Sequence, residues 1–463
     1  MNPSNQGRTT VAWRGVVKIG LALLLVPAAV SVAQAQDNVE PLRERIEALE
    51  EQIRQLEAQQ DRTSGAPAPM LETAPPTGDG PGGPEPANSR QTESLSDAVL
   101  STERIADEAE AEPAEPPIDI GGALRFNLGY QDFADASESK RGESGLDLFR
   151  LNVEGRLSNI IISAEYRYYP YMHTIHHGWL GYEFQDESQL QFGINQVPFG
   201  LLPYAAHNFW FGVPYHVGLA DDYDMGIKYQ RSNGPWSIHL AFYKNEELND
   251  PTNLNRYSFD LVRVRVDEQE NEQVNQLNTR LAYTFGAGTD CEVEVGGSGQ
   301  YSELYNHATD RSGDHWAAAT HIDSRCGRWN LQLQGLRYSY DPSNPPGVSD
   351  DVVRVGAFAD SYDIASEADI LVANLAYNFE PPWEQIDQII CYNDYSRLYK
   401  DIDGAVDSQI NTLGCAVGSG PLFTYIDWIY ANNMPFFGEN VSMGHGGVDE
   451  WRGRLNINVG FYW

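Results

Sequence analysis

Apolar and polar residues alternate with a period of two along most of residues 118–463. From 124 to 130, for example, the chain reads LRFNLGY, and the stretches 149–154, 189–194 and 454–463 repeat the pattern. Successive side chains of a β-strand point to opposite faces, so this period predicts strands with one apolar and one polar face. Two architectures produce it: a soluble sandwich of two sheets, and a transmembrane barrel with lipid outside and water inside.

The lengths of the connections favour the barrel. Short turns and long loops alternate along the chain, which is typical of outer-membrane barrels. The sequence therefore predicts an all-β fold, a 16-stranded antiparallel transmembrane β-barrel. Two further strand-like stretches, 257–266 and 352–359, would raise the number to eighteen. The sixteen strands are predicted near 120–133, 146–156, 159–169, 174–185, 188–195, 224–232, 235–244, 276–286, 290–301, 314–325, 328–340, 368–380, 385–396, 409–418, 421–431 and 451–463.

Aromatic pairs recur at the ends of alternate predicted strands. Four such ends at one rim form the aromatic girdle expected at a membrane interface. Because the chain also ends on an aromatic strand, we expect the barrel-assembly machinery to bind this C-terminus. The pairs are Tyr182/Phe184, Tyr283/Phe285, Tyr377/Phe379 and Phe461/Trp463.

The N-terminal part is organised differently. Residues 1–35 have a basic start, an apolar stretch at 19–32 and the sequence Ala-Gln-Ala at 33–35, which predicts a secretory signal peptide. Residues 36–60 carry apolar residues at 3-4-3-4-3 spacing, typical of a short coiled-coil helix, although a lone amphipathic helix gives the same pattern. Residues 61–117 contain ten prolines and predict a disordered linker. Residues 118–463 are left as the barrel domain.

Charge and motifs exclude several functions. The chain has 66 acidic and 31 basic residues, a net charge of −35. Such a chain lacks the basic footprint that nucleic acid needs. No nucleophile-elbow, phosphate-loop or zinc-protease motif occurs, so we predict neither an enzyme nor a cofactor.

The four cysteines provide a test of strand register. Residues opposite one another in a hairpin have a constant sum of residue numbers, because they are equally far from the middle of the loop. For each of two cysteine pairs, the midpoint of the two residue numbers falls within a predicted loop. We therefore predict disulfides Cys291–Cys326 and Cys391–Cys415. The alternative is four unpaired cysteines, and the spacing does not suit a metal site.

Two other clusters were considered as metal ligands. His173, His176 and His177 lie in the sequence HTIHH, and loop histidines are usually solvated. The acidic sequence DDYD, Asp221 to Asp224, could hold a divalent cation or shape the mouth of a loop, and we favour the second interpretation. No metal site is predicted.

Three stretches resemble the phosphate-selective porin O/P family: GGALRFNLGYQDF at 121–133, FGINQVPFGLL at 192–202 and the aromatic final strand. The resemblance implies a trimeric outer-membrane channel whose third long loop folds inward and narrows the pore. That loop is 196–223, and it includes Pro198, Phe199 and Gly200 and, at its end, Asp221 and Asp222, with Asp224 directly after it. Residues 118–463 carry 47 acidic and 22 basic residues, which does not favour phosphate selectivity.

Alternation also predicts which charges face the lumen. These residues are interpreted as general pore lining rather than as contacts for one solute. Glu292 and Glu294 have the same parity. The predicted pore-lining residues are Arg125, Arg150, Arg156, Arg167, Lys228, Arg280, Arg454, Glu154, Glu165, Glu183 and Asp427.

The sequence thus predicts a porin in the outer membrane of a Gram-negative bacterium, with lipid around it, a homotrimeric assembly and a periplasmic N-terminal segment. Small hydrophilic solutes or ions would diffuse passively through the lumen. Two alternatives remain open: a channel specific for phosphate or small organic anions, and a structural barrel anchor with a periplasmic coiled coil.

Overall fold

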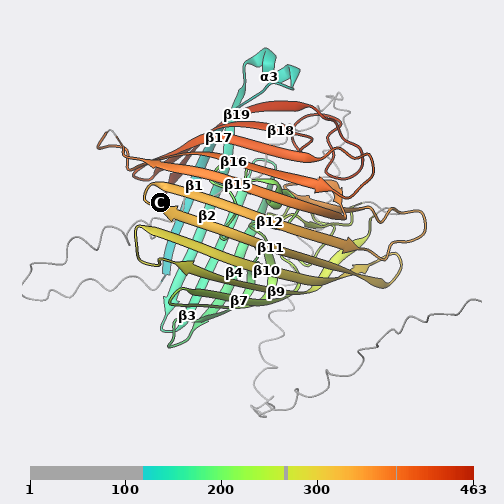
Figure 1. Cartoon of the computed structure of the whole chain (residues 1–463), viewed down its shortest axis with the longest axis horizontal. Coiled ribbons are helices and arrows are strands. Elements are labelled where there is room, and N and C mark those ends of the chain that lie inside the picture. The colour runs from blue at the N-terminus through green and yellow to red at the C-terminus, as the bar shows by residue number, and fades with distance from the viewer. Residues whose placement is uncertain (1–117, 265–268, 382) are drawn as a thin grey trace, which may run out of the picture. The chain divides into compact units, whose positions relative to one another are not determined.

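The computed structural model describes residues 118–264, 269–381 and 383–463, and sixteen strands in it form a closed antiparallel barrel. Figure 1 shows β1 to β9, in cyan to green, behind β10 to β19, in yellow to red. The barrel strands are β1 (Ile118–Gln131), β2 (Glu143–Leu157), β3 (Ile160–Tyr169), β4 (Met172–Glu183), β5 (Gln189–Gln196), β6 (Tyr223–Asn233), β7 (Trp236–Glu246), β9 (Asn271–Phe285), β10 (Cys291–Asn306), β11 (Arg311–Cys326), β12 (Trp329–Asp341), β15 (Glu367–Phe379), β16 (Gln388–Lys400), β17 (Ser408–Ser419), β18 (Leu422–Asn432) and β19 (Trp451–Tyr462).

The sixteen-strand prediction is confirmed, because each predicted strand overlaps one barrel strand. The ring closes between the first and last strands, with Ala123 opposite Tyr462. The backbone N–H of Gly122 donates to the carbonyl of Trp463, which extends this seam by one further hydrogen bond. No strand of the ring has a free edge, and every backbone group in the ring can be satisfied by a neighbour, as a lipid environment requires.

The alternative of eighteen strands is wrong. The two extra strand-like stretches instead contribute to a separate sheet, here called the loop sheet, made of β8 (Asp260–Leu261), β13 (Val352–Ala357) and β14 (Asp360–Ala365). All six residues of β13 are buried. A strand buried on both faces has the apolar character of a membrane strand but cannot face lipid, and this explains why the sequence pattern was ambiguous.

Apolar side chains cover the outside of the barrel. Leu240, Leu277, Leu371 and Leu413 are each more than half exposed although they lie in the middle of strands. Their neighbours along each strand point inward, and those of Leu240, Leu277 and Leu413 are polar or small. The exterior is therefore the face that a bilayer would solvate, and the polar interior is what sixteen strands can enclose.

Helices contribute little. The described helices are α3 (Asp135–Lys140), between β1 and β2, and α4 (Val213–His216), between β5 and β6. Neither has the length and apolar character to cross a membrane.

The aromatic pairs lie at the rim of the short turns. The rings of Tyr182 and Phe184 contact one another at a centroid distance of 5.1 Å, and the other three pairs make similar contacts. Phe184, Phe285, Phe379 and Trp463 are exposed.

Both cysteine pairs form disulfides in the structure, Cys291–Cys326 and Cys391–Cys415. Each pair lies directly opposite in its hairpin, β10–β11 and β16–β17. The predicted signal peptide (1–35), coiled coil (36–60) and linker (61–117) lie outside the described residues and stay predictions.

Replacement of Leu240 by Arg tests the outward orientation. A guanidinium on the lipid-facing side of β7 should lower the free energy of unfolding by ~2–4 kcal/mol. The same residue introduced by Ser312→Arg, at the exposed end of β11, should change it little. Denaturant titration of the barrel refolded in lipid vesicles measures both. Equal losses in the two variants would contradict a membrane-facing Leu240.

Candidate functional site

The connection between β5 and β6, loop 197–222, lies inside the barrel. Its apolar side chains are buried, among them Phe199, Phe209 and Trp210, each 2–3% exposed. The loop starts at β5 and contacts inward-facing side chains of β16, which is the eighth strand from β5 in either direction around the ring of sixteen. The loop therefore crosses the interior to the opposite wall.

A histidine and an aspartate make the contact with that wall. His207 Nδ1 lies 2.8 Å from Asp394 Oδ1, and His207 Nε2 lies 2.6 Å from Asn330 Oδ1. Because both ring nitrogens face an acceptor oxygen, the geometry suits the doubly protonated imidazolium. Burial alone would lower the pKa of His207, but the Asp394 carboxylate opposes it and the pKa is raised above its ordinary value.

The same wall holds the loop backbone. Asp394 Oδ2 accepts the backbone N–H of His207 at 2.6 Å and the side-chain amide of Asn208 at 2.8 Å. Further along, the N–H of Phe209 donates to Asp427 Oδ2 and the N–H of Val213 to Ser396 Oγ. Carboxylates that accept backbone N–H groups form charge-assisted bonds, which are stronger than neutral ones.

The start of the loop is bound to other strands. The N–H of Gly200 donates to Ser298 Oγ, the N–H of Leu201 donates to Gln334 Oε1, and Arg280 Nε donates to the carbonyl of Gly200. Gly200 has a φ of 62°, and a Cβ there would lie 2.3 Å from Gln334 Oε1. Only glycine fits this turn without displacing the amide that anchors it.

Wall cations stack on loop aromatics. The guanidinium of Arg125 lies 5.2 Å from the ring centre of Phe209, and that of Arg454 lies 4.3 Å from Trp210. Desolvated contacts of this kind contribute ~1–2 kcal/mol each. Lys228 Nζ donates to the carbonyl of Gln196, where the loop leaves β5.

The loop sheet packs on the same loop. The Tyr215 ring stacks on Phe211 at 4.2 Å and contacts Phe259 at its edge. Tyr362 Oη donates to the carbonyl of His216. Burial lowers the pKa of His216 to about 4, so this histidine is neutral within the aromatic cluster.

Most of the predicted pore-lining charges are buried in the structure. Loop 197–222 covers several of them: Phe209 lies against Arg125 and Trp210 against Arg454. The role of these charges as pore lining stays a prediction. The buried ones, each 7% exposed or less, are Arg125, Arg150, Arg167, Lys228, Arg280, Arg454, Glu165 and Asp427.

The remaining predicted lining residues lie near the short-turn rim and are more exposed. Arg156 is exposed and Glu154 and Glu183 are half-buried. Arg156 binds Glu183 with two hydrogen bonds, at 2.7 and 3.0 Å. Glu294, also of this parity, pairs with Arg280 at 2.5 Å.

Buried cations have buried acidic partners. Arg125 pairs with Asp147 at 2.8 Å, and Glu165 lies between Arg150 and Arg167. Loss of one member of such a pair leaves an uncompensated buried charge. These residues therefore stabilise the interior.

Two groups of side chains in the structure could hold a metal ion, and each differs in one residue from the groups considered in the sequence. Glu165, His176 and His177 lie together, and His173 is not among them. Arginines already neutralise Glu165. In the acidic cluster, Asp222 and Asp224 are joined by Asp260 of β8, whereas Asp221 accepts a hydrogen bond from Tyr257.

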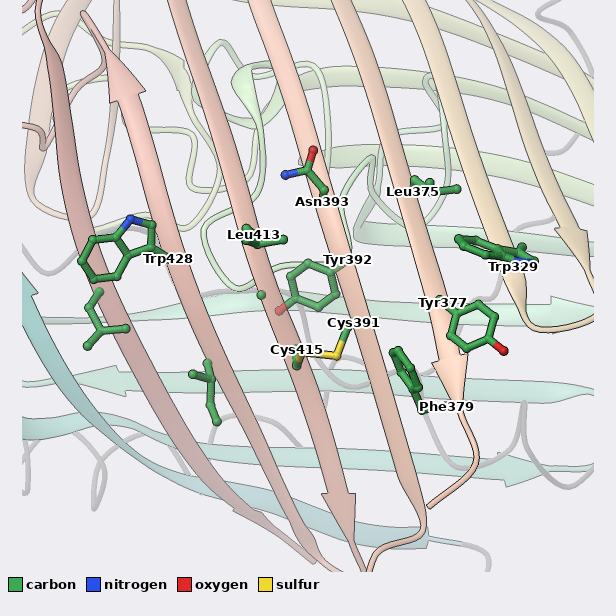
Figure 2. A pocket seen from close by; sticks show the side chains of 13 residues that line it. Trp329, Leu375, Tyr377, Phe379, Cys391, Tyr392, Asn393, Leu413, Cys415 and Trp428 are labelled. Atoms are coloured by element: carbon green, nitrogen blue, oxygen red, sulfur yellow. A yellow bond between two sulfur atoms is a disulfide. The ribbon is translucent and has the colours of Figure 1, made fainter. Parts of the chain in front are cut away.

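A groove of about 590 Å³ lies on the outside of the barrel. Figure 2 shows the Cys391–Cys415 disulfide bridging two neighbouring strands there, with Phe379, Tyr377 and Trp428 around it. Its apolar lining belongs to the lipid-facing surface.

The sequence missed the anchors of the loop. Asp394 and Ser396 have inward parity in a predicted strand and could have been included. Nothing local indicates that His207, 187 residues away from Asp394, would reach it.

No protein-family model matches the chain, and no curated protein matches its sequence. Among solved structures, OmpF of Salmonella typhi in complex with daunomycin is similar over 75% of this chain and 97% of its own, at 10% identity and a TM-score of 0.50. OmpT, an outer membrane protein of Vibrio cholerae, is similar over 75% and 99% at 13% identity, with a TM-score of 0.49. The outer membrane channel DcaP of Acinetobacter baumannii is similar over 75% and 97% at 9% identity, also with 0.49. The OmpF likeness agrees with the barrel fold, and the resemblance to the phosphate-selective porin O/P family stays a prediction.

The contact between His207 and Asp394 should depend on pH. Because the pKa of His207 is raised, its contact with Asp394 stabilises the loop fully at pH values below the ordinary pKa of histidine. This stabilisation is lost as the pH rises through the pKa that His207 has in the folded protein. Hydrogen exchange at the His207 and Asn208 amides, corrected for intrinsic rates, should accelerate as the pH rises above the ordinary histidine pKa. In Asp394→Asn the pH dependence should vanish. If it persists in that variant, the carboxylate does not control the loop.

Proposed function

We propose that this protein is a porin of a Gram-negative outer membrane. Small hydrophilic solutes or ions diffuse passively through its interior, which loop 197–222 narrows. The proposal involves no catalysis, energy source or cofactor.

One observation carries the proposal. A sixteen-stranded barrel with an apolar exterior encloses more space than its own side chains fill. Loop 197–222 crosses that space and is bound to β10 and β12 near its start and to β16 and β18 further on. A loop held at several points reduces the open cross-section of the barrel interior while the strands keep their places. A size-selective channel needs such a narrowing.

Charges at the short-turn rim support a channel with weak ion preference. Arg156 and Glu154 of β2 and Glu183 of β4 present both signs there. The cations further inside the barrel are paired with acids or donate to loop carbonyls. A pore lined by charges of both signs passes small ions of either sign, and this is why the general pore is preferred over a phosphate-specific or organic-anion channel.

The apolar exterior of the barrel and its final strand also have proposed partners. We propose that lipid solvates the apolar exterior, that the barrel-assembly machinery binds the aromatic final strand, and that the chain forms homotrimers. In this arrangement the N-terminal segment is periplasmic, with the coiled coil at 36–60. If the protein is instead a structural anchor, deletion of 37–117 abolishes its role while any conductance persists.

Single-channel recording in planar bilayers tests the function. The folded protein should give discrete conductance steps. His207→Ala, which removes the contact to Asp394, should raise the conductance and its fluctuations, because the loop is freed from the far wall. His445→Ala, at a half-exposed loop histidine, is the matched control and should behave like the parent. A folded protein that never conducts would refute the channel.

Reversal potentials in a salt gradient test the role of the rim. Arg156→Ala should shift the preference toward cations, and Glu183→Gln should shift it toward anions, because each removes one sign from the short-turn rim. Arg337→Ala is the control, since Arg337 is exposed and pairs with Asp369 and Glu367 on the outer side of β12. A shift in Arg337→Ala equal to that in Arg156→Ala would show that the rim does not set the preference.

A further inference from the structure

Five carboxylates lie together where loop 197–222 joins β6. Asp222 ends the loop, Asp224 is the second residue of β6, and Asp260 belongs to β8 of the loop sheet. Glu246 and Glu247, at and after the end of β7, complete the group. All five are at least nine-tenths buried.

The charges of this group are not balanced. Among the described residues, one guanidinium lies within ion-pair distance of it, that of Arg256. Arg256 Nη1 is 3.3 Å from Asp260 Oδ2, 3.5 Å from Glu246 Oε2 and 3.7 Å from Glu247 Oε2. Asp224 Oδ2 accepts a neutral hydrogen bond from Gln276 at 3.0 Å. Buried like charges without a counterion repel strongly in a medium of low polarity.

One buried oxygen in the group has neither a hydrogen-bond partner nor an ion pair among the described residues. It is Asp222 Oδ1, which belongs to a side chain only 6% exposed, and the Asp222 carboxylate lies beside those of Asp224 and Asp260. A buried carboxylate oxygen is ordinarily hydrogen-bonded, paired with a cation or bound to a metal. The unpartnered oxygen of Asp222 therefore indicates a cation that completes the group.

The donors and their spacing suit a hard cation. One oxygen from each of Asp222, Asp224 and Asp260 lies within 4.8 Å of the others. Two oxygens bound to one Ca²⁺ at its usual distances can be up to about 5.2 Å apart, so one Ca²⁺ can bind all three. The donors are all oxygen, with neither histidine nor cysteine, which suits a hard cation and not zinc or copper. A small cavity, about 10 Å³ in volume, is lined by Asp224, Glu246 and Asp260 on the barrel side of the group.

We propose that Asp222, Asp224 and Asp260 bind Ca²⁺, which ties the end of loop 197–222 to the barrel wall and to the loop sheet. The ligands come from two segments of the chain, residues 222–224 and β8 of the loop sheet, so the ion crosslinks parts of the chain that would otherwise repel one another. This site is independent of transport and would exist even in a barrel that does not conduct.

Thermal unfolding and calcium binding test the proposal. The full chain is refolded in detergent without lipopolysaccharide, which itself binds Ca²⁺, and is freed of metal with EDTA. At neutral pH, titration with CaCl₂ should give one site per chain by calorimetry and raise the melting temperature. Asp222→Asn and Asp260→Asn should each weaken calcium binding at least tenfold, whereas Asp403→Asn, at an exposed loop aspartate, should bind like the parent.

The difference in melting temperature between Asp222→Asn and the parent should change sign between EDTA and CaCl₂. A merely structural role of Asp222 would not produce this change of sign. In EDTA this variant should melt above the parent, because one repelling charge is removed. In excess CaCl₂ it should melt below the parent, because a ligand is lost. The proposal is overturned if the parent binds no calcium, if the two asparagine variants bind as the parent does, or if MgCl₂ produces the same shift as CaCl₂.

Discussion

Lipid outside a closed ring of strands is the constraint on which the rest of this structure depends. Because side chains alternate along every strand, an apolar exterior sends each second residue into the interior. Many of these residues are charged or carry amides, and a buried polar group must find a partner. Strand neighbours supply some partners, such as Asp147 for Arg125. The loops that fold inward supply others, as the carbonyl of Gly200 does for Arg280.

The interior accordingly has two parts with different chemistry. Around loop 197–222 the charges are buried, paired and bound to backbone groups, so they hold the loop in place. Near the short-turn rim, Arg156 and Glu183 pair while partly solvated, and water screens them. Exposed pairs of this kind contribute little to stability.

Strands, register and disulfide pairing could be predicted from the sequence because each depends on local information. The period of two locates strands such as β12, and a constant residue sum places Cys291 opposite Cys326. The destinations of the loops could not be predicted. His207 reaches Asp394 only because the ring closes with β5 and β16 on opposite sides, a property of the whole chain. Burial of Arg167 and Asp427 could not be predicted for the same reason, since parity shows direction but not what packs on top.

The position of the loop sheet could not be predicted from the sequence either. The stretch 352–359 has the composition of a membrane strand, yet its place is beside β8 and β14. Asp260 lies 36 residues beyond Asp224 and joins the acidic group through that sheet. A sequence motif such as DDYD therefore contained only part of its cluster.

The attachment of one loop to several walls has a mechanical consequence. Loop 197–222 acts as a cross-brace between strands on opposite sides of the ring, and its bonds to Ser298 and Ser396 resist ovalisation. Flattening of the cylinder would therefore have to stretch or break these bonds, so the loop helps to keep the ring of strands round.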